Sequence, residues 1–326
     1  MVTFGGMLLI VLHLIRQKGG FVDAVPIIAL YAFAGYRFMP ALQQIYSSIT
    51  QLKFIQPVLN NVHKDLKNLP LVKNDKKKTK ISFSKQIKLR DIHYTYPKSK
   101  NYSLKNINID IFGKNKIGIV GKTGSGKTTL VDLILGLLKP DTGFIEIDGT
   151  KINKDNVRSW QSLFGYVPQQ IYLSDESIAC NIAFGIPKNK INIKNLEYAS
   201  KISNIHNFIK NELPEGYNTK VGERGIRLSG GQRQRIGIAR ALYHKPKVLI
   251  FDEATTALDN ITEKEVISAL NNLDNKVTVI MIAHRLSTVS DCDNIFLMEK
   301  GEIVGSGKYD YLSKSNKKFN KLILAK

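Results

Sequence analysis

The sequence has few cysteines, the residues that hold together disulfide-linked domains and many domains with a structural metal ion. Its 326 residues include only two cysteines, Cys180 and Cys292, which form neither a CxxC pair nor any other metal-binding spacing. Disulfide frameworks and structural zinc sites need several cysteines at short spacings, so this composition excludes both. Two isolated cysteines are typical of a protein kept in a reducing compartment.

Acidic residues are also scarce. There are 27 Asp and Glu against 48 Lys and Arg, which gives a formal net charge of +21. Such an excess points to nucleic acid or to an anionic membrane surface, or it reflects the lysine enrichment of an AT-rich genome. The basic residues are scattered apart from the run at 73–80, KNDKKKTK. The sequence therefore lacks the cluster of basic residues that is typical of a nucleic-acid-binding surface.

No apolar run near the N-terminus reaches the roughly 20 residues that cross a bilayer. Residues 5–15 are apolar apart from His13, and residues 24–38 are apolar up to Arg37, with an extension through Leu42. Neither run has the basic start and small-residue cleavage site of a signal peptide. We therefore expect the end of one membrane helix, a short external loop and a last membrane helix that continues into the cytosol. Two buried helices of a soluble bundle are the alternative.

The segment after these runs keeps apolar residues at three-to-four spacing, which indicates a continuing helix. Its basic residues fit the positive-inside tendency of membrane proteins: Lys53, Lys64 and Lys67. The adjoining lysine run is expected to be a solvated linker. Hydrophobic residues make up 43% of the chain, which is enough for a sizeable core in the remaining residues.

A phosphate-binding loop comes after the first predicted strands. Residues 87–96 and 104–112 have β-rich, alternating sequences, and the apolar strand at 116–120 leads directly into GKTGSGKTT. This is the strand–GxxxxGK[ST]–helix pattern, in which backbone N–H groups wrap phosphates, Lys127 reaches the terminal phosphates and Thr128 offers a hydroxyl to Mg²⁺. The predicted nucleotide-binding residues of this loop are Gly121, Lys122, Thr123, Gly124, Ser125, Gly126, Lys127, Thr128 and Thr129.

Two later apolar strands end in polar side chains. KVLIFDE ends in Asp252 and Glu253, and KVTVIMIAH ends in His284. Ligands of open α/β sheets bind beyond the carboxyl ends of the parallel strands, so these side chains are placed for chemistry on a phosphate. We expect Asp252 to orient Mg²⁺, Glu253 to position or deprotonate a water, and His284 to contact the γ-phosphate. For a lone histidine, an ordinary surface position is the alternative.

A second glycine-containing segment, LSGGQRQR at 228–235, precedes a predicted helix, and a helix N-terminus binds anions. Together these motifs resemble the ATP-binding cassette (ABC) ATPases over about residues 85–325, with Leu228–Gln232 matching the family signature. The resemblance implies that Ser229, Gly230, Gly231 and Gln232 contact ATP held by a second cassette. Two ATP molecules would then be sandwiched in a head-to-tail dimer.

The resemblance also implies roles for single residues. Tyr96 resembles the aromatic that stacks on adenine, with Tyr94 as a stand-in, and Gln169 rather than Gln170 resembles the glutamine that contacts Mg²⁺ and the attacking water. Asp259 resembles the aspartate of a loop that crosses to a partner subunit. The implied catalytic residues are Glu253, His284, Gln169 and Lys127, and the implied metal ligands are Thr128, Gln169 and Asp252.

The expected fold is α/β: a P-loop NTPase with a RecA-like parallel core, an antiparallel β subdomain and an α-helical signature subdomain. The expected domains are a partial transmembrane domain at 1–68, a basic linker at 69–84 and an ABC nucleotide-binding domain at 85–326. Residues 221–223, just before the signature, resemble a loop of exporters. Since exporter halves carry six membrane helices before one cassette, we expect the C-terminal part of a half-transporter, as a fragment or a split reading frame.

The resemblance implies a Mg²⁺-dependent ATPase that works as a pair, its partners being a second, identical half-transporter and membrane lipids, and not nucleic acid. The implied location is the inner membrane of a bacterium, with the nucleotide-binding domain on the cytoplasmic face. Residues 31–54 resemble the last membrane helix of lipid-linked oligosaccharide flippases, so a lipid-linked saccharide or lipid is the expected substrate. A peptide, drug or lipid exporter stays open. Two other classes are a soluble ABC ATPase acting on nucleic acid or ribosomes and a domain with vestigial ATP binding.

Overall fold

The structure is a computed structural model that describes residues 2–17, 21–69, 81–252, 277–283 and 286–324. The chain divides into two compact units, residues 1–74 and 75–326.

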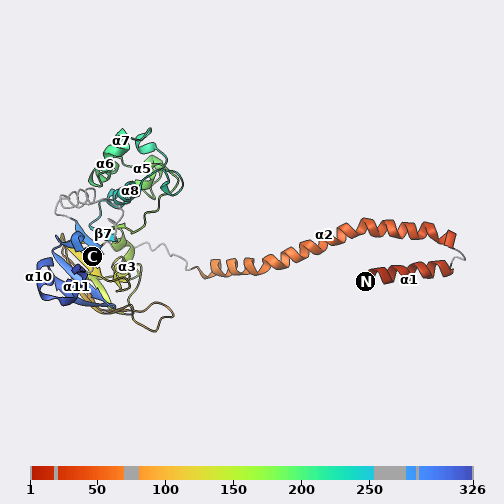
Figure 1. The fold of residues 1–326 in the computed structure, drawn as a ribbon, viewed down its shortest axis with the longest axis horizontal. Helices are drawn as coiled ribbons and strands as arrows, with labels where there is room; N and C mark the ends of the chain where they lie inside the picture. The colour runs from red at the N-terminus through yellow and green to blue at the C-terminus, as the bar shows by residue number, and fades with distance from the viewer. Residues whose placement is uncertain (1, 18–20, 70–80, 253–276, 284–285, 325–326) are drawn as a thin grey trace. The chain divides into compact units, whose positions relative to one another are not determined.

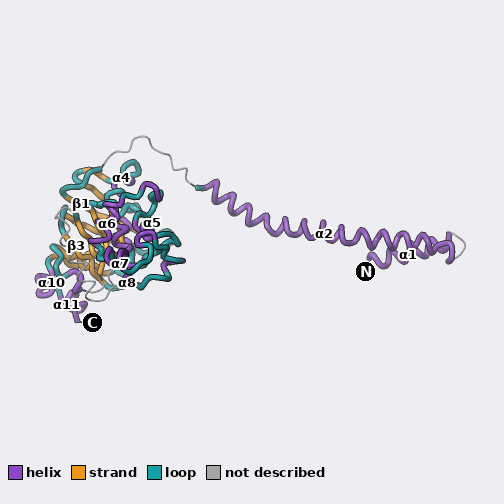
Figure 2. Tube along the Cα trace, turned by 90° about the horizontal axis from the view of Figure 1, so that it is seen from above, coloured by secondary structure: helices purple, strands orange, loops and turns teal. Residues whose placement is uncertain are grey.

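The first unit consists of two helices. α1 (Val2–Gln17) runs back alongside the first part of α2 (Phe21–Asn68) (Figures 1 and 2). The 48 residues of α2 extend about 70 Å at 1.5 Å per residue, more than twice the hydrocarbon core of a bilayer. By length and composition α2 is the one described helix that could span a membrane, over Val25–Asn68. Three prolines lie inside it, at positions 26, 40 and 57, and each removes one backbone hydrogen bond.

Large apolar side chains of α2 are exposed along most of the helix in this chain. A helix of a soluble bundle would bury one such face against its neighbours. The apolar window of α2 is not buried at all within the described structure. The exposed residues include Leu30, Phe33, Phe38, Leu42 and Phe54.

The core of the second unit is a six-stranded sheet in the order β10–β9–β3–β8–β7–β6. All neighbouring pairs are parallel except β9 and β10. β7 and β8 are buried along their whole length. Parallel strands that are covered on both faces carry continuous apolar runs, which explains the sequences of these two strands. The predicted parallel core is confirmed. Its strands are β3 (Lys116–Gly121), β6 (Phe164–Val167), β7 (Val248–Asp252), β8 (Thr278–Ala283), β9 (Asn294–Glu299) and β10 (Glu302–Gly307).

Helices cover both faces of this sheet. α3 (Lys127–Ile134) packs with Val248 and Ile250 of β7, whereas α8 (Gly230–Tyr243) packs in the cluster that holds Leu249 and Phe251. Alternate residues of one strand thus face two separate apolar cores, as the two-residue period of a strand requires.

The other helices of this unit are short. α5, α6 and α7 gather with α8 on one side of the unit, which confirms the predicted helical signature subdomain (Figure 1). The helices are α4 (Val157–Gln161), α5 (Ile178–Ile182), α6 (Ile193–Ile202), α7 (His206–Asn211), α10 (Tyr309–Ser315) and α11 (Lys317–Leu324). Short 3₁₀ turns are η1 (Lys188–Lys190), η2 (Gly216–Asn218), η3 (Glu223–Gly225) and η4 (Leu286–Val289).

A second, four-stranded antiparallel sheet has the order β2–β1–β4–β5 and confirms the predicted β subdomain. Two residues from the stretch assigned to the linker also pack here. Ile81 donates its N–H to Ser159 Oγ at 2.9 Å, and the ring of Phe83 lies edge-on to Trp160 at 6.2 Å. The strands are β1 (Gln86–Tyr94), β2 (Leu104–Phe112), β4 (Thr142–Ile147) and β5 (Thr150–Lys151).

β1 contains a bulge that shifts its alternation by one residue. Leu89 faces the core, but the next core residues are Ile92 and Tyr94 rather than 91 and 93. The extra residue is Asp91, whose φ of 47° lies in the left-handed region. Because a bulge changes which side chains face inward, it places Tyr94 inside and sets the direction in which the chain leaves β1.

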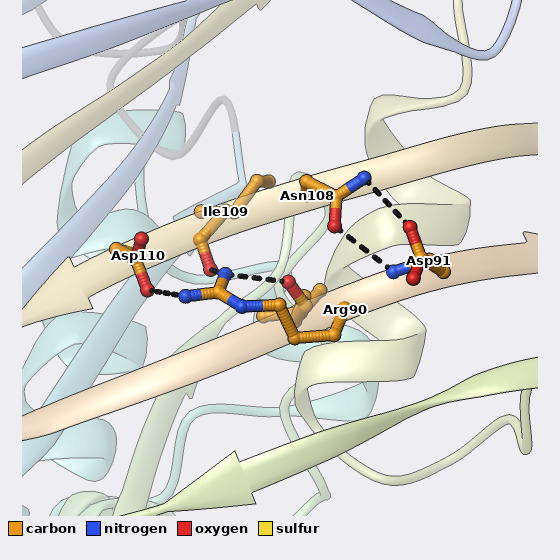
Figure 3. Close-up of polar contacts among 6 residues, drawn as sticks. Arg90, Asp91, Asn108, Ile109 and Asp110 are labelled. Carbon is orange, nitrogen blue, oxygen red and sulfur yellow. Dashed lines mark hydrogen bonds and ion pairs between the residues drawn. The ribbon is translucent and has the colours of Figure 1, made fainter.

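Side chains hold this bulge in place. Asn108 Oδ1 accepts the N–H of Asp91 at 3.0 Å, and Asn108 Nδ2 donates back to Asp91 Oδ1 at 3.2 Å (Figure 3). Beside them, Arg90 forms an ion pair with Asp110 at 2.6 Å. The backbone N–H that the bulge removes from the strand ladder is therefore satisfied by an amide side chain.

Candidate functional site

The loop between β3 and α3 curves around the ammonium group of Lys127. This side chain is only 5% exposed. Its Nζ donates to the carbonyl oxygens of Gly121 at 2.8 Å and Lys122 at 3.1 Å. A buried positive charge is thereby held against the loop, beside the start of a helix, where an anion is stabilised.

Close packing explains two of the three glycines of the loop, Gly121 and Gly126. A Cβ on Gly121 would lie 2.4 Å from the carbonyl oxygen of Met298 and 2.6 Å from Ser125 Oγ. Gly126 has a φ of 101°, and a Cβ there would lie 3.0 Å from the carbonyl oxygen of Ser103. Ser125 Oγ is buried and has no hydrogen-bond partner among the described residues. A narrow loop with an unpaired hydroxyl fits a phosphate oxygen, which supplies the missing partner.

A cleft of about 710 Å³ opens beside the loop, a size common for small-molecule sites. It is lined by the loop, by the chain that comes after β1, by Gln169 and by the β9–β10 turn. The structure brings these predicted residues together in its wall: Tyr96, Thr123, Gly124, Gly126, Lys127, Thr128, Thr129 and Gln169. Gln170 is not part of the lining. The lining residues that the sequence did not reveal are Ser99, Asn101, Tyr102, Ser103, Lys300 and Gly301.

Tyr96 and Tyr94 differ sharply in exposure. Tyr96 is 41% exposed in the cleft, and its hydroxyl lies 3.2 Å from Thr129 Oγ1. Tyr94 is 7% exposed and packs edge-on against the Tyr96 ring at 5.1 Å. Of the two, only Tyr96 lines the cleft within the described residues, and its stacking on adenine stays a prediction.

The β9–β10 turn joins the cleft through backbone hydrogen bonds. The N–H of Gly301 donates to the carbonyl oxygen of Ser125 at 3.0 Å, and its carbonyl oxygen accepts from the N–H of Lys105 at 2.8 Å. Lys300 precedes it with a φ of 48° and lines the cleft. Lys-Gly marks a tight turn in the sequence, but no local pattern shows that this turn lies against the phosphate loop.

Asp252 ends β7 with its side chain on the face covered by α3. It is 8% exposed and accepts a hydrogen bond from Tyr166 Oη on β6 at 3.1 Å. Burial and the charge of Asp252 raise the pKa of Tyr166 above its ordinary value. Burial and the same charge raise the pKa of Asp132, which lies one helical turn after Thr128 on α3. Asp252 at the end of β7 therefore lies close enough to Asp132 of α3 for the two charges to interact.

Three predicted residues, Glu253, Asp259 and His284, lie outside the described residues. Their assigned roles stay predictions from the sequence.

The signature segment begins α8. Ser229 caps the helix, since its hydroxyl accepts the N–H of Gln232 at 3.2 Å while Gln232 Oε1 accepts the N–H of Ser229 at 2.8 Å. Ser229 and Gly230 are exposed, and Gly231 is half-buried. None of the four residues from 229 to 232 is part of the cleft lining in the described part of this chain. The helix start is preformed and lies outside the lining of this cleft.

Fold and site together define a class. A parallel sheet with a phosphate loop between β3 and α3, and a buried carboxylate at the end of a neighbouring strand, is the arrangement of a P-loop NTPase.

Known proteins narrow this class. Residues 104–256 match the ABC transporter family. The leukotoxin export ATP-binding protein LtxB of Aggregatibacter actinomycetemcomitans is 40% identical over 296 residues, 89% of this chain and 40% of that protein. The leukotoxin translocation ATP-binding protein LktB of Mannheimia haemolytica is 42% identical over 275 residues, 84% of this chain and 37% of that protein. A solved bacterial Atm1-family ABC exporter with ATP bound has a TM-score of 0.75 at 29% identity, covering 91% of this chain and 52% of that one.

The chain carries an ABC transporter ATP-binding domain, homologous to those of exporters. It spans about two fifths of the length of these curated relatives, at 40% and 37%, and 52% of the solved exporter chain.

Proposed function

We propose that this chain is the ATP-hydrolysing part of an ABC exporter half-transporter. The observation that carries the proposal is the cleft in which Tyr96, the phosphate loop and Gln169 meet. An aromatic face for a base, a cationic loop for phosphates and an amide near the terminal phosphate are what a bound ATP requires. The proposed order along ATP is Tyr96 at adenine, Lys127 and the loop N–H groups at the phosphates, and Gln169 at the reacting end.

Mg²⁺ fits the residues at that end. It prefers one or two carboxylates and completes its octahedron with hydroxyls, waters and phosphate oxygens. Thr128, Gln169 and the buried Asp252 supply such donors. When bound, the ion neutralises charge on the β- and γ-phosphates. The nucleotide-binding residues proposed for the loop run from Gly121 to Thr129.

The chemistry proposed for the protein's own groups is positioning and charge stabilisation. Lys127 offsets the charge that develops on the transferred phosphoryl group, and Glu253 holds the water for in-line attack. His284 is proposed to hold the γ-phosphate and Asp259 to contact a partner. The signature residues, Ser229 to Gln232, are proposed to complete the site of a second copy of the chain, most simply an identical one.

The apolar, exposed α2 supports a membrane location rather than a soluble ATPase acting on nucleic acid or ribosomes. We place the cassette on the cytoplasmic face of a bacterial inner membrane, since the lysines after the apolar part of α2 favour that side. The proposed cargo is a lipid-linked saccharide or lipid. Relatives named for leukotoxin export make a leukotoxin-like cargo the second candidate.

The direct test is ATP hydrolysis by the full chain in detergent micelles. The parent should show Mg²⁺-dependent turnover, and both Lys127→Ala and Glu253→Gln should reduce it by at least about a hundredfold, the loss expected when charge stabilisation or water activation is removed. Binding of a fluorescent ATP analogue separates the two variants, since Glu253→Gln should still bind and Lys127→Ala should not. Unchanged hydrolysis by Glu253→Gln would contradict the assigned water-activating residue.

A further inference from the structure

Tyr166 reaches the buried carboxylate at the end of the neighbouring strand. β6 and β7 are parallel, and Tyr166 pairs with Ile250, two residues before Asp252. Residues two apart lie on the same face of a strand, and neighbouring strands lie about 4.8 Å apart. A long side chain ending in a hydroxyl is therefore needed to span from this position to the strand end, and Tyr166 Oη does so at 3.1 Å.

This contact is the one hydrogen bond that reaches the Asp252 side chain within the described part of the chain. It engages Oδ2 and leaves Oδ1 without a hydrogen bond from those residues. The terminal torsion of an aspartate is broad, so the carboxylate of a strand-end residue can rotate unless a partner fixes it. A single donor on Oδ2 selects one orientation of the Asp252 carboxylate and thereby also fixes the direction of Oδ1.

We propose that Tyr166 is a positioning residue for Mg²⁺: its hydroxyl holds Oδ2 of the Asp252 carboxylate in one orientation, so that Oδ1 stays available to the ion. This rests on the proposed function, in which Asp252 and Thr128 share the ion. The aromatic ring packs against the apolar core below α3, while the hydroxyl serves the carboxylate. The ring therefore supplies stability, and the hydroxyl supplies orientation.

Tyr166→Phe separates these two contributions, because it keeps the ring and removes only the donor. The full chain in detergent micelles is mixed with a fluorescent, non-hydrolysable ATP analogue, and MgCl₂ is titrated against an EDTA reference. We expect Tyr166→Phe to raise, by about tenfold, the MgCl₂ concentration that gives half-maximal enhancement of analogue binding. Tenfold is the lower end of the loss of metal affinity seen when a metal ligand loses its hydrogen-bonding partner. Binding in EDTA should stay within about twofold of the parent, since the loop and Lys127 hold the phosphates without the ion.

Tyr217→Phe is the matched control. It also removes one tyrosine hydroxyl, which lies 2.8 Å from His206 Nδ1 in the helical subdomain. Its Mg²⁺ titration should equal that of the parent. A Tyr166→Phe titration equal to the parent's overturns the positioning role, and so does an equal loss of binding with and without Mg²⁺, which indicates a purely structural tyrosine. If the parent itself shows no Mg²⁺ enhancement, the proposed function fails together with this inference.

Discussion

At the scale of single residues, exposure decides between neighbouring side chains of the same type. Tyr94 and Tyr96 are equally aromatic and only two positions apart, so the sequence leaves both as adenine contacts. The bulge at Asp91 sets the alternation that buries Tyr94 at 7% exposure, whereas Tyr96 lies beyond the end of β1 and is 41% exposed. Gln169 and Gln170 are both exposed, yet only Gln169 lines the cleft within the described residues.

Asp148 gives a residue-scale prediction of pH dependence. Partial burial works to raise the pKa of this carboxyl, but hydrogen bonds donated by the N–H groups of Gln86, Ser84 and Lys85 outweigh it and lower the pKa. The folded pKa thus lies below the unfolded value of about 3.9. The stabilisation is present above about pH 4 and is lost as the pH falls through the folded pKa.

Asp148→Asn should therefore lower the free energy of unfolding by about 1 kcal/mol at pH 7, since hydrogen bonds to a charged acceptor are replaced by neutral ones. Asparagine tolerates the left-handed backbone of this position, where φ is 47°, so only the charge is tested. Trp160, the only tryptophan of the chain, is buried and reports urea unfolding by fluorescence. A difference from the parent that stays the same between pH 7 and pH 3 would count against this account.

At the scale of elements, the Ser229 hydroxyl at the start of α8 has one observed role, the helix cap, and one proposed role, a phosphate contact. Ser229 caps its own helix by accepting the N–H of Gln232. A hydroxyl has one donor and two acceptor sites, so it can donate to a phosphate of a second copy without giving up the cap. The helix N-terminus is thus rigid before any nucleotide arrives, which reduces the ordering cost of closing a site.

Two substitutions at this position separate the roles. Ser229→Ala should lower the free energy of unfolding by about 1 kcal/mol through loss of the cap. Ser229→Asp should keep the cap and remain within about 0.5 kcal/mol of the parent, because Asp is an equally good N-cap residue. It should nevertheless abolish ATP hydrolysis, since its carboxylate repels the γ-phosphate. Urea unfolding and phosphate release measure the two effects, and an active Ser229→Asp chain would exclude a signature–phosphate contact.

At the scale of the whole molecule, the phosphate loop and the signature residues, both proposed to contact ATP, lie at two separate places in the cassette. The cleft has the phosphate loop, while the signature residues are absent from its described lining. A head-to-tail pair would combine the loop of each copy with the signature of the other. Twofold symmetry then produces two identical sites.

Subunit mixing tests that arrangement. Lys127→Ala chains lack a working loop and Ser229→Arg chains lack a working signature, so each alone should be inactive. Mixed pairs contain one site in which both halves are intact. Co-assembled at equal amounts, the two chains should recover up to about a quarter of the parent's turnover, because half of random pairs carry one good site of two.

The control is a chain that carries both substitutions. Mixed with the parent, it should give no more turnover than the parent copies account for. If Lys127→Ala and Ser229→Arg chains stay inactive when mixed, each site is formed within one chain, and the proposed pairing is wrong.

The sequence by itself determined the features that depend on short spacings. The phosphate loop, the apolar strand ending at Asp252, the signature helix start and the two-sheet α/β class all arise from patterns within about ten residues, where a strand, turn or helix start has its own chemistry. The bulge was not predicted: residues 87–96 were expected to alternate, and the structure shows that the core positions shift from Leu89 to Ile92.

Only the tertiary structure decided which distant segments meet. Tyr166 contacts Asp252 because β6 pairs with β7 in one register, and Lys300 lines the cleft because Gly301 bonds to Ser125. The same holds for Ile81 and Phe83, which belong to the core although their neighbours are polar. Register and packing depend on strand order across more than a hundred residues, and a local pattern carries no information about that order.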